Sequence, residues 1–262
     1  DEASNGRAYL GIARGGWLDY LELEPRHGVT ALREAFACVR HLLQQAKEPL
    51  PGKVFSLAGG DSLRWPILRP DVPFLLGSWG AQTIRACINA IDELKIGGSA
   101  NPDVIPVYRE LLDTAAQAAG RQRLSVAIAM GAVTVVDHDG AAARALARRE
   151  VALYLPVVAA LDATVEIEPD RLQRLRTAAA NYDFDAAAAL VSDALLRRFA
   201  FAGTPDQVAE QAHALFAAGA QRVEFGTPHG IRAAEGLRLL GAVVLPALQQ
   251  AGLVEPLVEP LT

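Results

Sequence analysis

The sequence has few of the residues and patterns that mark several protein classes. Only two cysteines, Cys38 and Cys87, occur in 262 residues. They form neither a disulfide framework nor a zinc pattern, so we expect both to be small buried hydrophobic residues. The longest apolar candidate, Leu124–Val136, is shorter than the roughly 18 residues of a membrane span. No signal peptide is expected. Because the first residue is Asp rather than Met, we expect that upstream sequence has been lost.

An excess of basic residues is also lacking. The chain has 25 Lys and Arg against 30 Asp and Glu, a net charge of −5. Phosphate recognition needs a concentrated basic face, so we expect no nucleic-acid partner. Hydrophobic residues make up 51% of the chain and charged residues 21%, which is typical of a globular rather than a disordered protein. We expect a cytoplasmic protein with a small-molecule ligand.

Common catalytic motifs are missing too. The sequence contains no P-loop, no Cys-x-x-Cys pair, no His-Glu-x-x-His zinc motif and no Gly-x-Ser-x-Gly elbow. The segment Gly11–Gly16 only mimics the glycine spacing of a dinucleotide-binding loop. No obvious acid–base set is present, which suggests that a cofactor carries the chemistry. We expect no metal site.

Short apolar runs alternate with longer segments of helical periodicity. Five runs are predicted to be strands: Arg7–Ala13, Val72–Gly77, Leu94–Gly97, Leu124–Val136 and Arg222–Gly226. Eight segments are predicted to be helical: Thr30–Gln45, Gln82–Ile91, Asp103–Ala118, Asp139–Leu153, Asp170–Ala180, Asp183–Arg198, Thr204–Ala218 and Ala233–Gln250. Asn101 and Thr204 are expected to cap the helices that begin at or just after these positions. This order predicts a parallel α/β architecture, either an open doubly wound sheet or a (β/α)8 barrel.

Residues 153–201 form a long stretch with helical patterns but no predicted strand. An insertion of this size usually serves function. No Gly/Ser-rich or Pro-rich linker divides the chain, so we expect one domain over residues 1–262. A closed barrel needs eight strands and five are predicted, so either the sheet is open or three N-terminal strands are absent.

Glycines follow four of the five predicted strands. The four strand exits are Gly11–Trp17, Gly77–Gly80, Gly97–Asn101 and Gly226–Gly230. Ligands of parallel α/β folds bind beyond the carboxyl ends of the strands, and glycine lets the backbone approach a flat ring or a phosphate. The exit at Gly77–Gly80 leads into a helix, whose amide groups favour an anion. Ordinary turns also need glycine, so a purely structural role stays open.

Two histidines lie where chemistry is conceivable. His138 stands between Asp137 and Asp139, and we expect a capped turn there rather than a metal site. His229 follows the last predicted strand, where an imidazole donates a hydrogen bond to a ligand or moves a proton near neutral pH. The alternative is that His229 caps the turn before the helix that begins at Ala233.

Several segments, taken in order, resemble a known family. Gly6–Gly15 with Leu32–Ala35 resembles the fourth strand and helix of the bacterial luciferase-like superfamily, and Arg69–Gly80 resembles its fifth strand. Phe201–Val208 resembles the start of its last-but-one helix. Val223–Gly230 is similar to the eighth strand of its methylenetetrahydromethanopterin reductase-like branch.

The resemblance implies a (β/α)8 TIM barrel, of which this chain would cover strands four to eight only. It also implies an oxidoreductase that uses coenzyme F-420 or FMN for hydride transfer to or from a small organic substrate, and a homodimer or higher oligomer. An FMN-dependent monooxygenase is the alternative within the fold. A non-catalytic barrel fragment that acts through subunit association is the alternative from another class.

The resemblance also implies which residues contact the ligands. The implied cofactor contacts are Arg14, Gly15, Asp19, Gly77, Ser78, Trp79, Gly80, Gln82 and Thr83. Gly97, Gly98 and Ser99 would lie on the substrate side, and His229 is the catalytic candidate. Gly16 stands where deazaflavin-dependent sugar-phosphate dehydrogenases of this superfamily carry a catalytic Glu, so that reaction is not expected.

Overall fold

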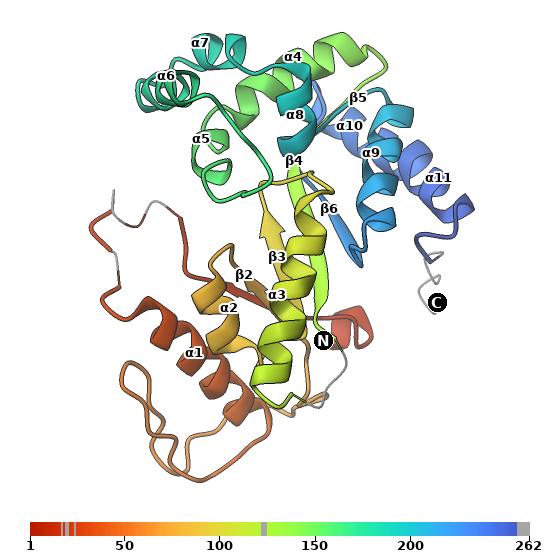
Figure 1. Cartoon of the computed structure of the whole chain (residues 1–262). Helices are drawn as coiled ribbons and strands as arrows, with labels where there is room; N and C mark the ends of the chain where they lie inside the picture. The colour runs from red at the N-terminus through yellow and green to blue at the C-terminus, as the bar shows by residue number, and fades with distance from the viewer. Residues whose placement is uncertain (17, 19–20, 24, 122–124, 256–262) are drawn as a thin grey trace. The chain divides into compact units, whose positions relative to one another are not determined.

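The computed structural model describes residues 1–16, 18, 21–23, 25–121 and 125–255 (Figure 1). Its contacts divide the chain into two compact units. Unit 1 comprises residues 1–95 and 109–127, and unit 2 comprises residues 96–108 and the chain from residue 128 onward.

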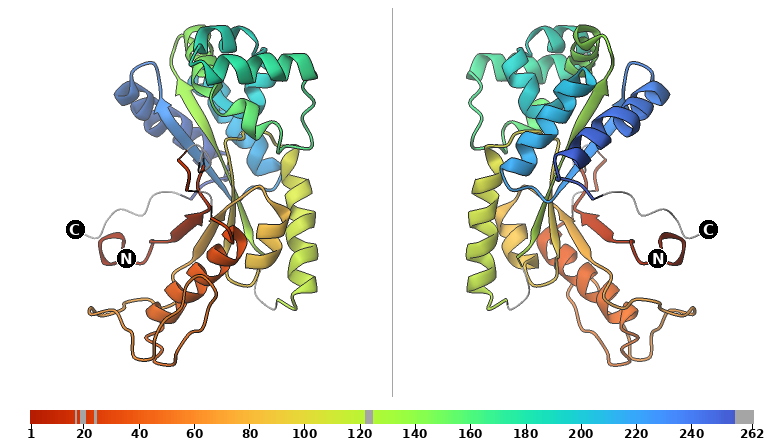
Figure 2. Two further views of the ribbon diagram at one scale, coloured as in Figure 1. Left: turned by 90° about the vertical axis from the view of Figure 1, so that its left-hand side faces the viewer. Right: turned by 90° about the vertical axis from the view of Figure 1, so that its right-hand side faces the viewer.

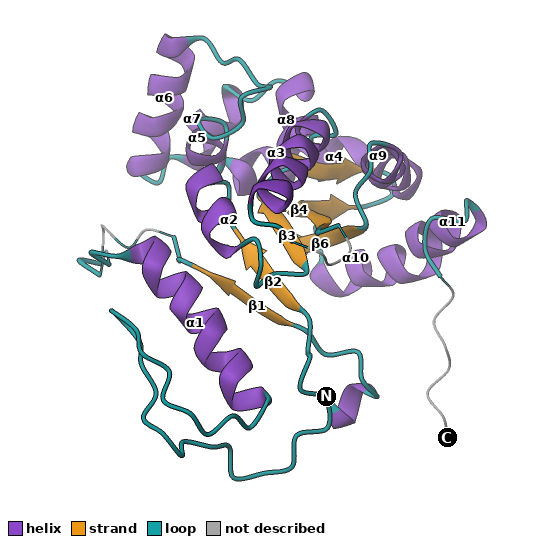
Figure 3. Cartoon of the chain, turned by 60° about the horizontal axis from the view of Figure 1, so that its bottom comes forward, coloured by secondary structure: helices purple, strands orange, loops and turns teal. Residues whose placement is uncertain are grey.

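Unit 1 is built on parallel strands. Strand β1 (Leu10–Ala13) pairs in parallel with β2 (Phe74–Gly77), and β2 pairs in parallel with the first residues of β3 (Glu93–Gly97). Helices α1 (Gly28–Leu43) and α2 (Ala81–Cys87) pack against each other beside the strands (Figure 3).

Aromatic packing fixes α1 on this sheet. Phe36 of α1 and Phe74 of β2 are both buried, with ring centroids 5.3 Å apart. The Arg40 guanidinium lies 4.0 Å from the centre of the Phe74 ring and donates to the carbonyl oxygens of Pro70 and Val72. Phe36 and Arg40, one helical turn apart on α1, therefore bind β2 and the residues that precede it.

A long loop between α1 and β2 is held by one carboxylate. Between residues 44 and 73 the chain has no helix or named strand, and Figure 2 shows it as an extended loop. Glu34 of α1 accepts hydrogen bonds from the backbone N–H groups of Lys53, Val54 and Phe55, at 2.9, 2.7 and 3.0 Å. These three bonds lower the pKa of Glu34 to about 2, because they stabilise the charged form.

Unit 2 is also built on parallel strands. Strand β4 (Ala127–Val136) pairs in parallel with β5 (Ala200–Gly203) and with β6 (Arg222–His229). The helices that flank this sheet are α4 (Gly140–Val151), α9 (Pro205–Ala217), α10 (Ala233–Leu239) and α11 (Leu245–Gln250), with the π-helical turn Leu240–Val244 between the last two. Helix α3 (Val104–Ala118) starts in unit 2 and ends in unit 1.

Four further helices form a group at the top of Figure 1. They are α5 (Leu155–Val158), α6 (Pro169–Ala180), α7 (Phe184–Ala189) and α8 (Asp193–Phe199). Arg148 and Arg149 of α4 form ion pairs with Asp193 and Asp185. These interhelical pairs hold α7 and α8 on α4.

The structure confirms the parallel α/β class but corrects the strand count. Residues 153–201 were expected to hold no strand, yet β5 begins at Ala200 and adds a sixth strand. Its sequence, Ala-Phe-Ala-Gly, has little intrinsic strand preference; β5 forms because it is fully buried and pairs with β4 from Val133 to Val136. The described residues form six strands rather than the five predicted, so the assignment of the chain to barrel strands four to eight only is not supported.

Other element boundaries differ modestly. The predicted helix Asp183–Arg198 is two helices, because Ser192 caps a new start at α8. The expected caps at Thr204 and Asp139 are confirmed, since Thr204 forms a capping box with Gln207 and Asp139 accepts from the amides of residues 141 and 142. The last strand continues through His229 instead of ending at Gly226.

Both cysteines are free thiols. Cys87 is buried and Cys38 is half-buried, and burial raises the pKa of Cys87 to about 11. Within the described part of the chain, no helix combines the length and apolar character that a membrane crossing requires.

We expect Glu34→Gln to lower Tm by a few degrees at pH 7, because a neutral amide is a weaker acceptor for three backbone N–H groups. The folded-state pKa of about 2 lies below the ordinary value of 4.5, so the carboxylate stabilises the fold above pH 4.5 and loses this effect as the pH falls toward 2. The Tm difference between wild type and variant, measured by circular dichroism, should therefore shrink over that range.

The exposed Glu110 of α3 provides the matched control, and Glu110→Gln should leave Tm unchanged. A Tm difference for Glu34→Gln that stays constant from pH 7 to pH 3 would contradict the role of the charged form.

Candidate functional site

Strand pairing in unit 1 brings two of the predicted strand exits together. Ala13, the last residue of β1, is the register partner of Gly77, the last residue of β2. The segments that follow, Arg14–Gly15 and Ser78–Thr83, therefore leave the sheet side by side at its carboxyl edge. The space between the strand ends is narrow, since a Cβ on Gly77 would lie 3.1 Å from the Cβ of Ala13.

The exit of β2 is lined by small and polar groups. Gly80 has an extended backbone and stands at the N-cap of α2. Its N–H donates to Ser78 Oγ at 3.1 Å. A Cβ on Gly80 would meet Thr83 Oγ1 at 3.5 Å and Ser78 Oγ at 3.7 Å, which are ordinary contacts. The free protein therefore has room for a side chain at Gly80, and only a ligand close to the backbone would exclude one.

Other expected cofactor contacts are placed around these two exits. Arg14 is exposed, and its aliphatic stem lies along the backbone of Gly28. Gly15 has a φ of 101°, a conformation that side chains rarely adopt. Trp79 is half-buried and Gln82 is exposed. Asp19, also expected to contact the cofactor, lies outside the described residues.

This set of groups fits an anionic cofactor with a flat ring. Hydroxyl and amide donors come from Ser78, Thr83 and Gln82, and Arg14 supplies a positive charge. Small residues at the strand ends leave backbone on which a ring can lie. The site does not depend on a strong helix dipole, because α2 has only seven residues. The hydroxyl, amide and guanidinium groups can bind an anionic ligand, and the backbone at Gly80 is open to one.

The expected substrate-side residues belong to unit 2 and differ in accessibility. Gly97 is half-buried, and a Cβ placed there would meet nothing within 4 Å. Gly98 has a φ of 77°, and a Cβ there would lie 2.9 Å from Val158 of α5. Ser99 is fully buried, and its hydroxyl accepts from the N–H of Asn101 at 3.2 Å. Of these three residues, Gly97 offers the open surface and Ser99 faces the protein interior.

His229 is the last residue of β6, opposite Val135 of β4. Its backbone φ is 74°, and its Nε2 lies 3.2 Å from the carbonyl oxygen of Phe225. Because a carbonyl only accepts, Nε2 is the donor in this contact and Nδ1 is the remaining acceptor. Helix α10 has no side-chain cap, so the imidazole does not cap its start.

One polar cluster of unit 2 was not identified as a site from the sequence. Asn101 and Asp162 are buried and hydrogen-bonded to each other, at 2.8 Å from Asn101 Nδ2 to Asp162 Oδ2. Burial and the Asp162 charge raise the pKa of Tyr108 to about 12. The sequence showed Asn101 only as a helix-capping signal, and nothing in a single sequence relates it to Asp162 or to Arg198.

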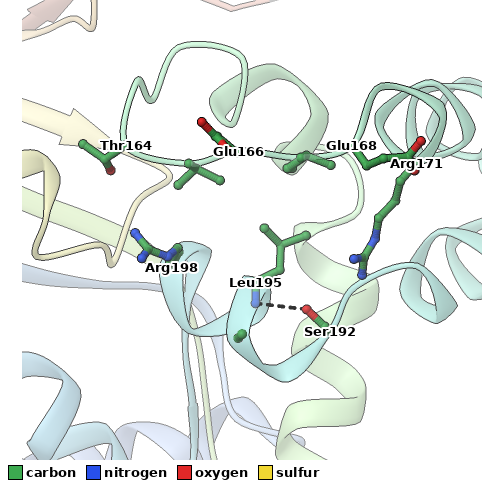
Figure 4. Close-up of a pocket in the computed structure, with 10 residues that line it drawn as sticks. Thr164, Glu166, Glu168, Arg171, Ser192, Leu195 and Arg198 are labelled. Atoms are coloured by element: carbon green, nitrogen blue, oxygen red, sulfur yellow. Dashed lines mark hydrogen bonds between the residues drawn. The ribbon is translucent and has the colours of Figure 1, made fainter.

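A cavity of about 270 Å3 lies next to this cluster (Figure 4). In Figure 4, Arg198 and Arg171 lie on opposite sides of Leu195, with Glu166 and Glu168 along the facing loop. Arg171 donates to the carbonyl oxygen of Leu190. The described residues contain no group of three or more His, Cys, Asp or Glu side chains arranged to hold a metal ion.

Comparison with known proteins identifies several similar enzymes. The chain is 29% identical over 263 residues to 5,10-methylenetetrahydromethanopterin reductase of Archaeoglobus fulgidus, covering 95% of this chain and 76% of the relative. The coenzyme F-420-dependent tetrahydromethanopterin reductase from Methanopyrus kandleri has a similar structure, with a TM-score of 0.81 at 24% identity over 93% of this chain and 75% of that one.

A flavin enzyme has the same fold. The oxygenating constituent of 3,6-diketocamphane monooxygenase from Pseudomonas putida, in complex with FMN, matches with a TM-score of 0.60 at 17% identity over 94% of this chain and 72% of that one. The family model for luciferase-like monooxygenases matches residues 1–222. The resemblance found in the sequence is thereby confirmed, and the chain belongs to the luciferase-like monooxygenase family.

Proposed function

We propose that the chain is an oxidoreductase that binds coenzyme F-420 and transfers a hydride to or from a small organic substrate of the methylenetetrahydromethanopterin type. The observation that carries this proposal is the pairing of Ala13 with Gly77, which places two small-residue strand exits side by side. Family membership and the two reductases among the similar proteins support the same reaction class.

Each exit has a distinct task in this proposal. Gly15 and Gly80 leave room for the cofactor to lie on the backbone, while Arg14, Ser78 and Thr83 bind its anionic and polar groups. When bound, the deazaflavin or flavin ring supplies the hydride chemistry. The protein orients the reactants and excludes water from them, which is the main contribution of a scaffold to such reactions.

We assign proton transfer to His229 of unit 2. With Nε2 donating to Phe225, Nδ1 is the atom that accepts a proton from a substrate or a bound water. Gly97 provides the open backbone on the substrate side.

FMN is the second cofactor candidate, and the similarity to an FMN complex is the observation that favours it. Titration of the purified protein with FMN and with coenzyme F-420, followed by absorbance, distinguishes the two cofactors. Turnover of methylenetetrahydromethanopterin with reduced coenzyme F-420 tests the reaction. If neither cofactor binds saturably, the proposal is overturned. We further propose that the strands belong to a closed (β/α)8 barrel, that the protein forms a homodimer or a higher oligomer, and that it is cytoplasmic.

We expect Gly80→Val to raise the cofactor Kd at least tenfold, about 1.4 kcal/mol. A branched side chain would occupy the space into which the cofactor must come, whereas the free protein accommodates a Cβ at ordinary distances. Cofactor titration measures the Kd, and thermal unfolding should show nearly unchanged Tm. Gly80→Ala, with one methyl group, should have a smaller effect. Equal affinities for wild type and both variants would exclude this turn from the cofactor site.

We expect His229→Gln to reduce kcat roughly 10²-fold with little change in Tm, because an amide keeps the contact with Phe225 but cannot move a proton. The backbone φ of 74° requires a control, and His229→Asn supplies it because Asn tolerates this region. Steady-state kinetics of both variants give kcat and KM. A loss confined to KM would show that His229 only positions a ligand.

A further inference from the structure

The buried polar cluster of unit 2 has an amide at its centre. Asn101 is fully buried and uses both ends of its side chain. Its Nδ2 donates to Asp162 Oδ2 and to Thr164 Oγ1, both at 2.8 Å. Its Oδ1 accepts from Arg198 Nη1 at 2.8 Å and from the N–H of Asp103 at 3.2 Å. Because one end faces a carboxylate and the other a guanidinium, only one orientation of the amide satisfies both neighbours.

The cluster has a buried carboxylate at one end and a guanidinium at the other. The Asp162 side chain belongs to a residue only 2% exposed, and its Oδ1 accepts from the N–H and the hydroxyl of Thr164 at 2.9 and 2.7 Å. Arg198 also pairs with Asp103 at 2.9 Å. A buried carboxylate is costly unless it is fully hydrogen-bonded, and removal of one partner destabilises it strongly. Asn101 therefore links the buried carboxylate of Asp162 to the guanidinium of Arg198 through the two ends of its amide.

Backbone hydrogen bonds hold the segment Gly97–Asn101, which ends at the cluster. The N–H groups of Gly98 and Ser99 donate to the carbonyl oxygen of Gly131 at 2.7 and 3.2 Å. The N–H of Ala100 donates to the carbonyl oxygen of Arg198 at 2.9 Å. The exit of β3 is thus fastened to β4 on one side and to α8 on the other.

The same cluster lies next to α5 and the cavity. Val158 of α5 packs on Gly98, and Asp162 lies four residues after the end of α5. Thr164 and Arg198 hydrogen-bond with Asn101 and also line the cavity. The hydrogen bonds of Asn101 therefore join the end of the segment that begins at Gly97 to two residues of the cavity wall.

We propose that Asn101 is a positioning residue of the substrate site. By joining Asp162 to Arg198, it sets the conformation of Gly97–Ser99 and the position of this segment relative to the cavity wall. The inference rests on the proposed function, because it assigns the substrate to the Gly97 side. It predicts that disturbing Asn101 impairs substrate binding and leaves cofactor binding intact.

The test exchanges the side chains of residues 101 and 162. Asn101→Asp is isosteric and places two carboxylates against each other at the position of a 2.8 Å hydrogen bond. Asn101→Asp combined with Asp162→Asn restores one amide and one carboxylate in reversed order, with Arg198 then facing a carboxylate directly. Asn181→Asp, at an exposed position of the same unit, is the control with the same change in charge.

We expect Asn101→Asp to raise the KM for methylenetetrahydromethanopterin about tenfold or more, with the cofactor Kd changed less than about twofold. Hydrogen exchange of the amides of residues 98–100 should accelerate in the same variant. The double variant should recover most of both losses, as coupled neighbours do in a double-mutant cycle. Asn181→Asp should match wild type.

Thr164→Val is the milder variant if Asn101→Asp does not fold. It removes one partner of Asn101 and one of Asp162 at nearly constant volume, and we expect KM to rise about threefold. Faster amide exchange with unchanged kinetics would overturn the inference, as would a KM defect that the double variant does not repair. A wild-type protein inactive with both cofactors would overturn the proposed function, and the inference with it. An active wild type matched by Asn101→Asp would overturn the inference alone.

Discussion

Parallel pairing of the strands is the constraint from which the candidate site follows. In a parallel sheet the carboxyl ends of neighbouring strands lie at one edge, so residues far apart in the sequence leave the sheet together. Ala13 and Gly77 meet in this way in unit 1, and Val135 and His229 do so in unit 2. The chemistry of the site is therefore decided by which residues follow each strand.

Two carboxylates perform the same structural task in the two units. Glu34 binds three successive amides of the long loop after α1, and Asp162 binds Asn101 and Thr164 after α5. Both are largely excluded from solvent. Glu34 joins the loop to α1, and Asp162 joins the segment after α5 to Asn101, which precedes α3. Backbone amides in irregular segments lack the partners that a helix or strand provides, and a carboxylate supplies several acceptor positions at once.

The arrangement suits chemistry that a cofactor carries. Small residues at the strand ends carry no reactive side chain of their own, and they leave the backbone accessible to a ligand. Catalysis of this kind depends on orientation, so the rigidity of the strand exits matters more than their individual reactivity. The cluster around Asn101 supplies such rigidity where the Gly97 exit has no side chain of its own to hold it.

Periodicity and turn chemistry in the sequence were enough to predict the parallel α/β class, the five strands that carry strong apolar runs, and the caps at Thr204 and Asp139, because each of these is a local signal. The family was also predictable, since its motifs occur in order along the chain. Strand β5 was not, because Ala-Phe-Ala-Gly becomes a strand only through burial and pairing with β4. The hydrogen bonds that connect Asn101 to Asp162 and Arg198 were likewise decided by the tertiary structure. These partners are 61 and 97 positions apart, and such long-range contacts produce no periodic pattern in a single sequence.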